Sequence, residues 1–146
     1  MSGNSRIPAL PLVLGLAGVL PFLAAALSQW MPLGGLAQGQ GIRGGIAYGA
    51  VVLSFLGGIR WGKALGDGRT QDFFVSIIPA LAGWLAILLP QPLMGVGLLI
   101  AGFMLQAMWD VKSADSGQLP RWFGTLRAIL SAGAVISLLA MLVPLI

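Results

Sequence analysis

The chain alternates long apolar stretches with short polar segments. An α-helix needs about 20 mostly apolar residues to cross the roughly 30 Å hydrocarbon core of a bilayer. Stretches of about that length lie at residues 7–28, 43–62, 73–89, 93–109 and 122–143. The pattern predicts an all-α integral membrane protein, with residues 1–146 forming a single domain, a bundle of five transmembrane helices.

The first apolar stretch could be mistaken for a signal peptide, because a short polar start with one arginine precedes it. It is long for a signal peptide, and Pro21 interrupts it. We interpret it as a retained helix. Between the third and fourth stretches, Pro90-Gln91-Pro92 predicts a tight break, because proline lacks a backbone N–H and restricts the residue before it.

The basic residues predict the orientation of the helices. With five spans, one side of the membrane holds seven of the eight basic residues and the other side holds only Arg43. Short cytoplasmic segments are enriched in lysine and arginine. We therefore expect the N-terminus in the cytoplasm and the C-terminus outside. The seven are Arg6, Arg60, Lys63, Arg69, Lys112, Arg121 and Arg127.

Composition narrows the classes of function. Hydrophobic residues make up 58% of the chain and charged residues 8%, and glycine occurs 22 times. Soluble domains carry roughly 25% charged residues, so a soluble enzyme, a nucleic-acid-binding domain and a disordered chain are excluded. The net charge of +4 instead favours contact with anionic lipid head groups.

Several kinds of chemistry lack their usual residues. The chain contains no cysteine, no histidine and no glutamate, and its four acids are all aspartates. Thiolate and imidazole ligands are therefore absent, as is the imidazole base that activates serine and cysteine nucleophiles. We expect no catalytic residues, no metal site and no cofactor.

Polar residues near the cytoplasmic helix ends are the main candidate site. Gln106 and Asp110 are four residues apart and share one helix face, while Arg60 and Arg127 belong to other helices. A charge within the hydrocarbon costs about 2.5–3.5 kcal/mol, so it should pair or reach water. We hypothesise that Asp110 pairs with Arg127 or Arg60. Such a cluster could bind a proton, an ion or a lipid head group, or it could be a purely structural clamp.

Glycines at intervals of four mark the second stretch. Gly41, Gly45 and Gly49 form one set, and Gly58 and Gly62 belong to another. This spacing lets two helices approach closely. Packing within the bundle is the favoured interpretation, and a seam between two copies of the chain is the alternative.

The tryptophans resemble the aromatic belts that anchor proteins at membrane interfaces. Trp30, Trp61, Trp109 and Trp122 lie near predicted helix ends. Trp84 lies in the middle of a span, where it could face lipid, neighbouring helices or a ligand.

Two segments carry a resemblance to a known family. Residues 54–62 (SFLGGIRWG) and 119–127 (LPRWFGTLR) resemble the transmembrane protein 69-like family of small membrane proteins, whose function is unknown. The resemblance implies a multi-span protein of the bacterial inner membrane. It supplies no activity and adds no catalytic residue.

Three classes of function stay open. The favoured one is an accessory or assembly protein that binds membrane lipid or a partner, which could be another membrane protein or a second copy of the chain. The second is a small transporter or channel lined by Arg60, Gln106, Asp110 and Arg127. The third is an enzyme that modifies a lipid or quinone, with Asp110 as its acid or base.

Overall fold

A computed structural model describes residues 6–31, 34–35 and 37–146, and the elements found in these ranges are helices. Strands are absent from the ranges so described. The α-helices are α1 (Ala9–Leu27), α2 (Gln38–Asp67), α3 (Thr70–Ser76), α4 (Ile78–Leu88), α5 (Pro92–Asp115) and α6 (Arg121–Leu142), and a short 3₁₀ turn, η1 (Val143–Leu145), follows.

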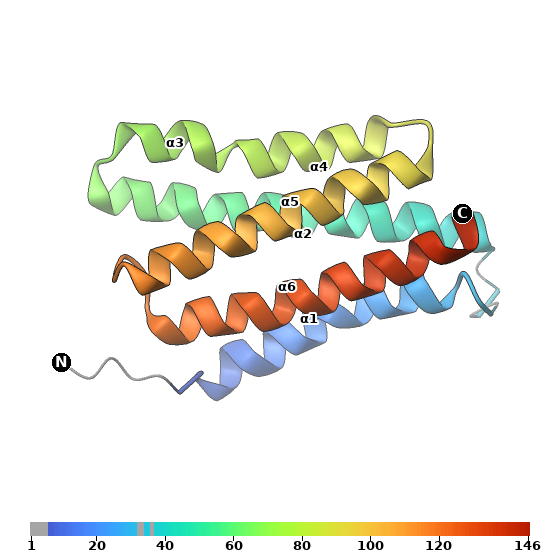
Figure 1. Ribbon diagram of the computed structural model, residues 1–146, viewed down its shortest axis with the longest axis horizontal. Coiled ribbons are helices and arrows are strands. Elements are labelled where there is room, and N and C mark those ends of the chain that lie inside the picture. The colour runs from blue at the N-terminus through green and yellow to red at the C-terminus, as the bar shows by residue number, and fades with distance from the viewer. Residues whose placement is uncertain (1–5, 32–33, 36) are drawn as a thin grey trace.

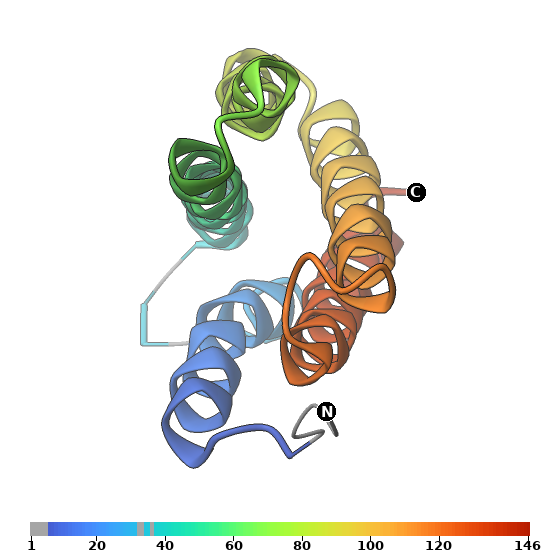
Figure 2. The same cartoon turned by 90° about the vertical axis from the view of Figure 1, so that its left-hand side faces the viewer.

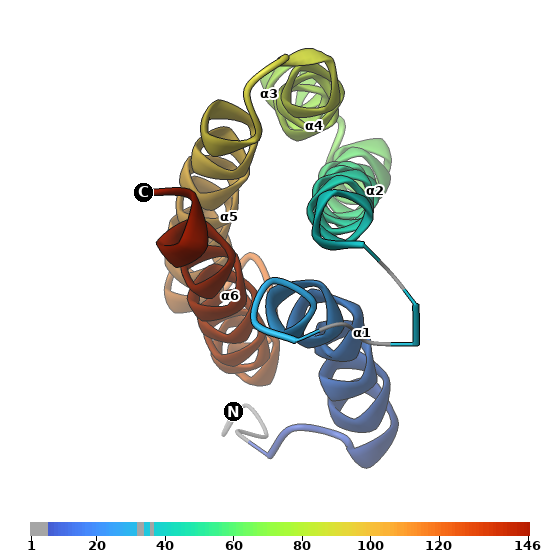
Figure 3. The same ribbon diagram turned by 90° about the vertical axis from the view of Figure 1, so that its right-hand side faces the viewer.

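The helices form an elongated bundle with their axes roughly along its length (Figure 1). Seen from either end, α1, α2, the α3–α4 pair, α5 and α6 follow one another around a ring, and α6 closes it against α1 (Figures 2 and 3). The start of α1 and the end of α6 lie at opposite ends of the bundle, as an odd number of spans requires (Figure 1).

The prediction of five spans is confirmed. Among the described residues, five helical segments are long and apolar enough to cross a membrane, and α3 and α4 together supply the third of them. The sequence suggested one continuous helix for this third segment. The structure instead shows two helices that meet at a break at Ile77. Pro79 explains the break, since proline cannot donate the next helical hydrogen bond and its ring crowds the preceding turn.

Two helices, α2 and α5, extend beyond the ends of the predicted spans. α2 begins at Gln38 and ends at Asp67, so Arg43 and Lys63 lie inside the helix instead of bounding it. α5 continues through the polar residues as far as Asp115. Apolar length reports only the part of a helix inside the hydrocarbon. The end of α2 is instead set by Gly68, which follows Asp67 and caps the helix with a φ of +66° that suits glycine.

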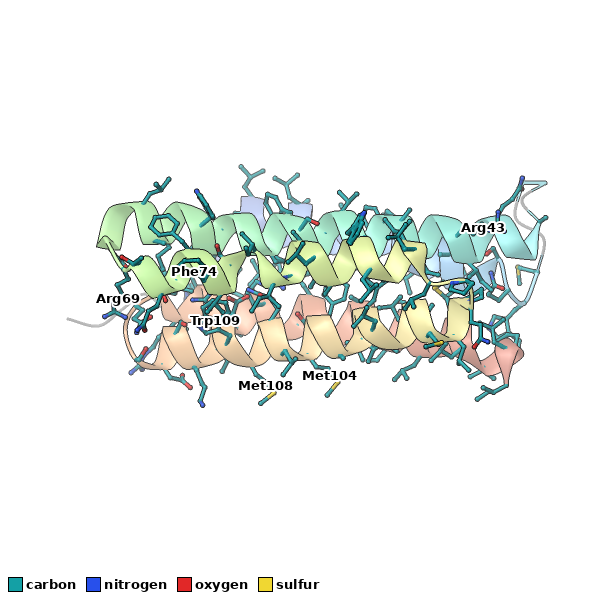
Figure 4. The ribbon with its side chains drawn as sticks, turned by 90° about the horizontal axis from the view of Figure 1, so that it is seen from above. Arg43, Arg69, Phe74, Met104, Met108 and Trp109 are labelled. Atoms are coloured by element: carbon teal, nitrogen blue, oxygen red, sulfur yellow. The ribbon has the colours of Figure 1, made fainter. Side chains whose placement is uncertain are left out.

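Apolar side chains both fill the interior and cover the outside of the bundle. Phe22, Leu53, Leu99, Phe103, Leu138 and Met141 are almost completely buried. Many other large apolar side chains point outward, among them Trp84, which is 61% exposed. Met104 and Met108 of α5 also point away from the bundle (Figure 4). This outer surface suits lipid, and the exposure of Trp84 shows that its ring does not pack inside the bundle.

Candidate functional site

Three helices bring charged side chains together around Asp110. Nε and Nη2 of Arg60 on α2 donate to Oδ1 of Asp110 on α5, at 3.0 and 2.6 Å. Nε of Arg127 on α6 donates to Oδ2 of Asp110 at 3.0 Å. A single carboxylate therefore holds two guanidinium groups, and it ties α2, α5 and α6 together.

These three charged groups are buried inside the bundle. Arg60, Asp110 and Arg127 are 3%, 2% and 6% exposed. At a helical rise of 1.5 Å per residue, they lie roughly 7–11 Å from the nearest ends of their helices. Charge at that depth is costly unless it is paired and hydrogen-bonded, so the hydrogen bonds of this network offset the cost of burying the three groups.

Neighbouring polar and aromatic groups complete the network around Arg60 and Asp110. Nη1 of Arg60 donates to Oγ of Ser113 at 2.9 Å, and Nε2 of Gln106 donates to Oδ1 of Asp110 at 3.4 Å. The guanidinium carbon of Arg60 lies 4.2 Å from the ring centroid of Trp109, within the range of a cation–π contact.

Sequence reasoning missed two members of this network. It gave Ser113 no role and treated Trp109 as an interfacial anchor. Ser113 lies one helical turn beyond Asp110, so the three-residue spacing was a usable signal. Trp109 carried no comparable signal, because its contact with Arg60 depends on how α2 and α5 pack (Figure 4).

An apolar pocket of about 400 Å³ lies beside this network. Side chains of α1, α2 and α6 form its walls, and Phe103 of α5 contributes from the core. Its volume falls within the range typical of small-molecule sites. Arg127 and Ser131 also line it, so one wall of an otherwise apolar pocket carries a guanidinium group.

The pocket extends to the outer surface between α1 and α2. Leu14 of α1 and Phe55 of α2 both line it and are 62% and 67% exposed. Deeper inside, Phe22 packs edge-on against Tyr48, and the Tyr48 hydroxyl donates to the Gly18 carbonyl oxygen at 2.7 Å. This hydrogen bond holds α1 and α2 together beside the pocket.

The candidate glycines of α2 divide into two groups. An added Cβ would lie 1.8 Å from Ser28 Oγ at Gly41, 2.7 Å from Met141 at Gly45 and 2.8 Å from Leu99 at Gly49. These three glycines therefore permit close helix contacts. Packing against other helices does not extend to Gly58 and Gly62, because no described atom outside the neighbouring backbone of α2 lies within 4 Å of an added Cβ there.

Gly57, to which the glycine spacing assigned no packing role, also lies close to a neighbouring helix. An added Cβ at Gly57 would lie 2.4 Å from the backbone carbonyl oxygen of Ser76. Ser76 is the last residue of α3, next to the break at Ile77. Gly57 therefore allows α2 to pack directly against the broken third span.

The described residues contain no cluster of side chains that could form a metal site. No three residues of the kinds that ligate metals come together among them. Asp67 instead forms an ion pair with Lys63 of the same helix. The described side chains thus offer charge and hydrogen bonding at the candidate site, and no set of metal ligands.

Comparisons with known proteins agree with a membrane protein of unknown activity. Residues 7–143 match the family described as "Protein of unknown function (DUF3429)". A Xenopus tropicalis protein named transmembrane protein 69 is 37% identical over 138 residues, which cover 90% of this chain and 53% of that protein. Its Mus musculus counterpart is 31% identical over 143 residues, covering 90% and 55%. The chain thus spans about half the length of these relatives. No solved structure matches it.

Proposed function

Because this chain belongs to the DUF3429 family of transmembrane protein 69-like proteins, whose function is unknown, we propose a function from its own geometry. It acts as an accessory membrane protein that binds a lipid-like molecule in the pocket between α1, α2 and α6. The observation that carries this proposal is an apolar pocket of about 400 Å³ with Arg127 in its wall. An apolar body with one polar end matches those surroundings.

The geometry favours binding over transport. A transport path would need polar groups along the bundle, but the charged network lies near one end. The core beyond it is built from Leu53, Leu99, Phe103 and Leu138. Ions crossing such a core would lose their hydration without replacement.

Binding is also favoured over catalysis by Asp110. Oδ1 of Asp110 accepts hydrogen bonds from Arg60 and Gln106, and Oδ2 accepts one from Arg127. A general base needs an oxygen within reach of a substrate proton. Both oxygens of Asp110 are instead engaged with the two guanidinium groups, and the residue is only 2% exposed.

The proposed location is the bacterial inner membrane, with α1 beginning on the cytoplasmic side. Seven of the eight basic residues belong to the segments assigned to that side, which supports this orientation. The named relatives are vertebrate proteins, and they support a multi-pass membrane location without specifying the membrane.

A pair of neighbouring substitutions on α2 tests the proposal. Val52 lines the pocket, whereas Val51 is exposed on the outer face of the same helix. We expect Val52→Phe to fill the pocket and to lower the amount of co-purified lipid about tenfold, a loss of about 1.4 kcal/mol in binding free energy. Val51→Phe should leave it unchanged.

The measurement is mass spectrometry of lipid retained after extraction from the native membrane in mild detergent. Thermal unfolding of both variants checks that Val52→Phe remains folded. Lipid retention that is equal in wild type, Val51→Phe and Val52→Phe would contradict the pocket as the binding site.

A further inference from the structure

We propose, building on the lipid-binding function above, that the pocket selects a membrane lipid whose alkyl chain carries one acid group. The acid group lies against Nη1 of Arg127, and the chain extends along the apolar wall toward Phe22. Charge, hydrogen-bonding capacity and pocket shape each support this ligand class.

The charge of the buried network is the first argument. Arginine stays protonated in proteins, so Arg60 and Arg127 contribute two positive charges and ionised Asp110 contributes one negative charge. Among the described residues, Asp110 is the acid that pairs with these arginines. The network therefore holds one uncompensated positive charge in an apolar setting, and a monoanionic ligand would neutralise it.

The hydrogen bonds of Arg127 supply the second argument. Nε donates to Asp110, and Nη2 donates to Ser131 Oγ at 3.3 Å. Nη1 has no hydrogen-bond partner among the described residues. Every fully buried side-chain nitrogen or oxygen of the described residues has a partner, so Nη1 must be partly accessible. Arg127 lines the pocket, so an acid group there would meet a donor that is still available.

The third argument is the shape of the pocket around Arg127. Its lining on α6 runs from Phe123 to Ala134, about 16 Å at a helical rise of 1.5 Å per residue. Apart from Arg127 and Ser131, the residues of α6 that line the pocket are apolar. Such a wall accommodates an alkyl chain, while the opening between Leu14 and Phe55 admits it from the bilayer.

Photolabelling with two chain-matched probes tests the charge requirement. The probes are hexadecanoate and hexadecanol, each with the same diazirine on the chain, added to the full chain in phosphatidylcholine nanodiscs at mildly alkaline pH. We expect hexadecanoate to label residues 11–22 and 123–134 about tenfold more than hexadecanol does, the size of effect given by one charge-assisted hydrogen bond. The labelled peptides are identified by mass spectrometry.

Variants at Arg127 separate charge from structure. Arg127→Gln leaves Arg60 paired with Asp110 as a neutral pair, so the bundle keeps a balanced network. We expect this variant to lose the preference for hexadecanoate while still taking up both probes. Arg127→Lys should restore part of the preference. Arg121→Gln, at the exposed start of α6, should keep all of it.

The outcomes distinguish this inference from the proposed function. Equal labelling of the pocket by both probes in the wild type overturns the charge requirement and leaves lipid binding intact. Absence of pocket labelling by either probe overturns lipid binding itself. Displacement of hexadecanoate by phosphatidylglycerol supports a lipid acid as the ligand, whereas displacement by inorganic phosphate alone overturns the lipid source.

Discussion

Asp110 is the residue on which the interior charge balance depends. It accepts hydrogen bonds from both Arg60 and Arg127, and these two side chains belong to different helices. Removing the carboxylate charge would leave two guanidinium groups facing each other in a setting that excludes water. Leaving buried charges without a partner is among the most destabilising changes that a single substitution makes.

We therefore expect Asp110→Asn to lower the free energy of unfolding by about 3–5 kcal/mol. The measurement is thermal or denaturant unfolding of the purified protein in detergent. Asp115→Asn, at the exposed end of the same helix, should have little effect. Adding Arg127→Gln to Asp110→Asn should restore part of the loss, and a double variant as unstable as the sum of the single ones would contradict charge balance as the cause.

At the same residue scale, helical periodicity predicts only the contacts within one helix, whereas the pairing of Asp110 with Arg127 or Arg60 was hypothesised from the cost of an unpaired charge. Spacing of four places Gln106 beside Asp110 and Arg127 beside Ser131, because residues of one helix share a face at that interval. The contact between Arg60 and Asp110 joins residues 50 positions apart. It depends on the rotation and vertical offset of two helices, which the periodicity of either helix leaves undetermined.

Among the helices, α2 combines a packed face with an open face. Gly45 and Gly49 touch α1, α5 and α6 through Ala25, Leu99 and Met141, while Gly58 and Gly62 meet open space in the described structure. The same four-residue spacing therefore has two different consequences along one helix. Spacing identifies which residues share a face, but only the positions of the neighbouring helices decide whether that face is covered.

This division predicts opposite effects of alanine along α2. Gly49→Ala should destabilise the protein by about 1–3 kcal/mol, because its Cβ would collide with Leu99, whose side chain is completely buried in the core and therefore cannot swing out of the way. Gly62→Ala should be neutral or stabilise it by up to about 1 kcal/mol through higher helix propensity. Unfolding of both variants in the same detergent tests this. If Gly62→Ala also destabilised the protein, or broke a dimer seen by cross-linking, the open face would instead be a contact between two copies.

The number of spans was predictable at this scale, whereas the break within the third was not anticipated. Five apolar stretches suffice to count helices that cross a membrane. Pro79 signals an irregularity, but prolines also occur within continuous membrane helices, as Pro21 does in α1. The break at Ile77 lies next to Ser76, whose carbonyl oxygen α2 approaches at Gly57. This contact joins segments that are distant in the sequence.

For the whole molecule, the arrangement of charge predicts an orientation across the membrane. Arg43 lies at one end of the bundle, and Arg69 lies toward the other (Figure 4). We expect alkaline phosphatase fused after Ile146 to be active and green fluorescent protein fused there to be dark, because the first folds outside the cytoplasm and the second inside. The reverse pattern would place the Arg69 end outside and contradict the positive-inside assignment.

The sequence separation within the charged network also affects how the protein is made. Asp110 follows Arg60 by 50 residues, so at synthesis rates of 5–20 residues per second the ribosome completes it roughly 3–10 s later. Arg127 follows later still. During that interval the second helix carries a charge with no partner in the chain, so it should remain beside the insertion machinery or at the water interface. The bundle then closes late in translation, once α5 supplies the carboxylate of Asp110.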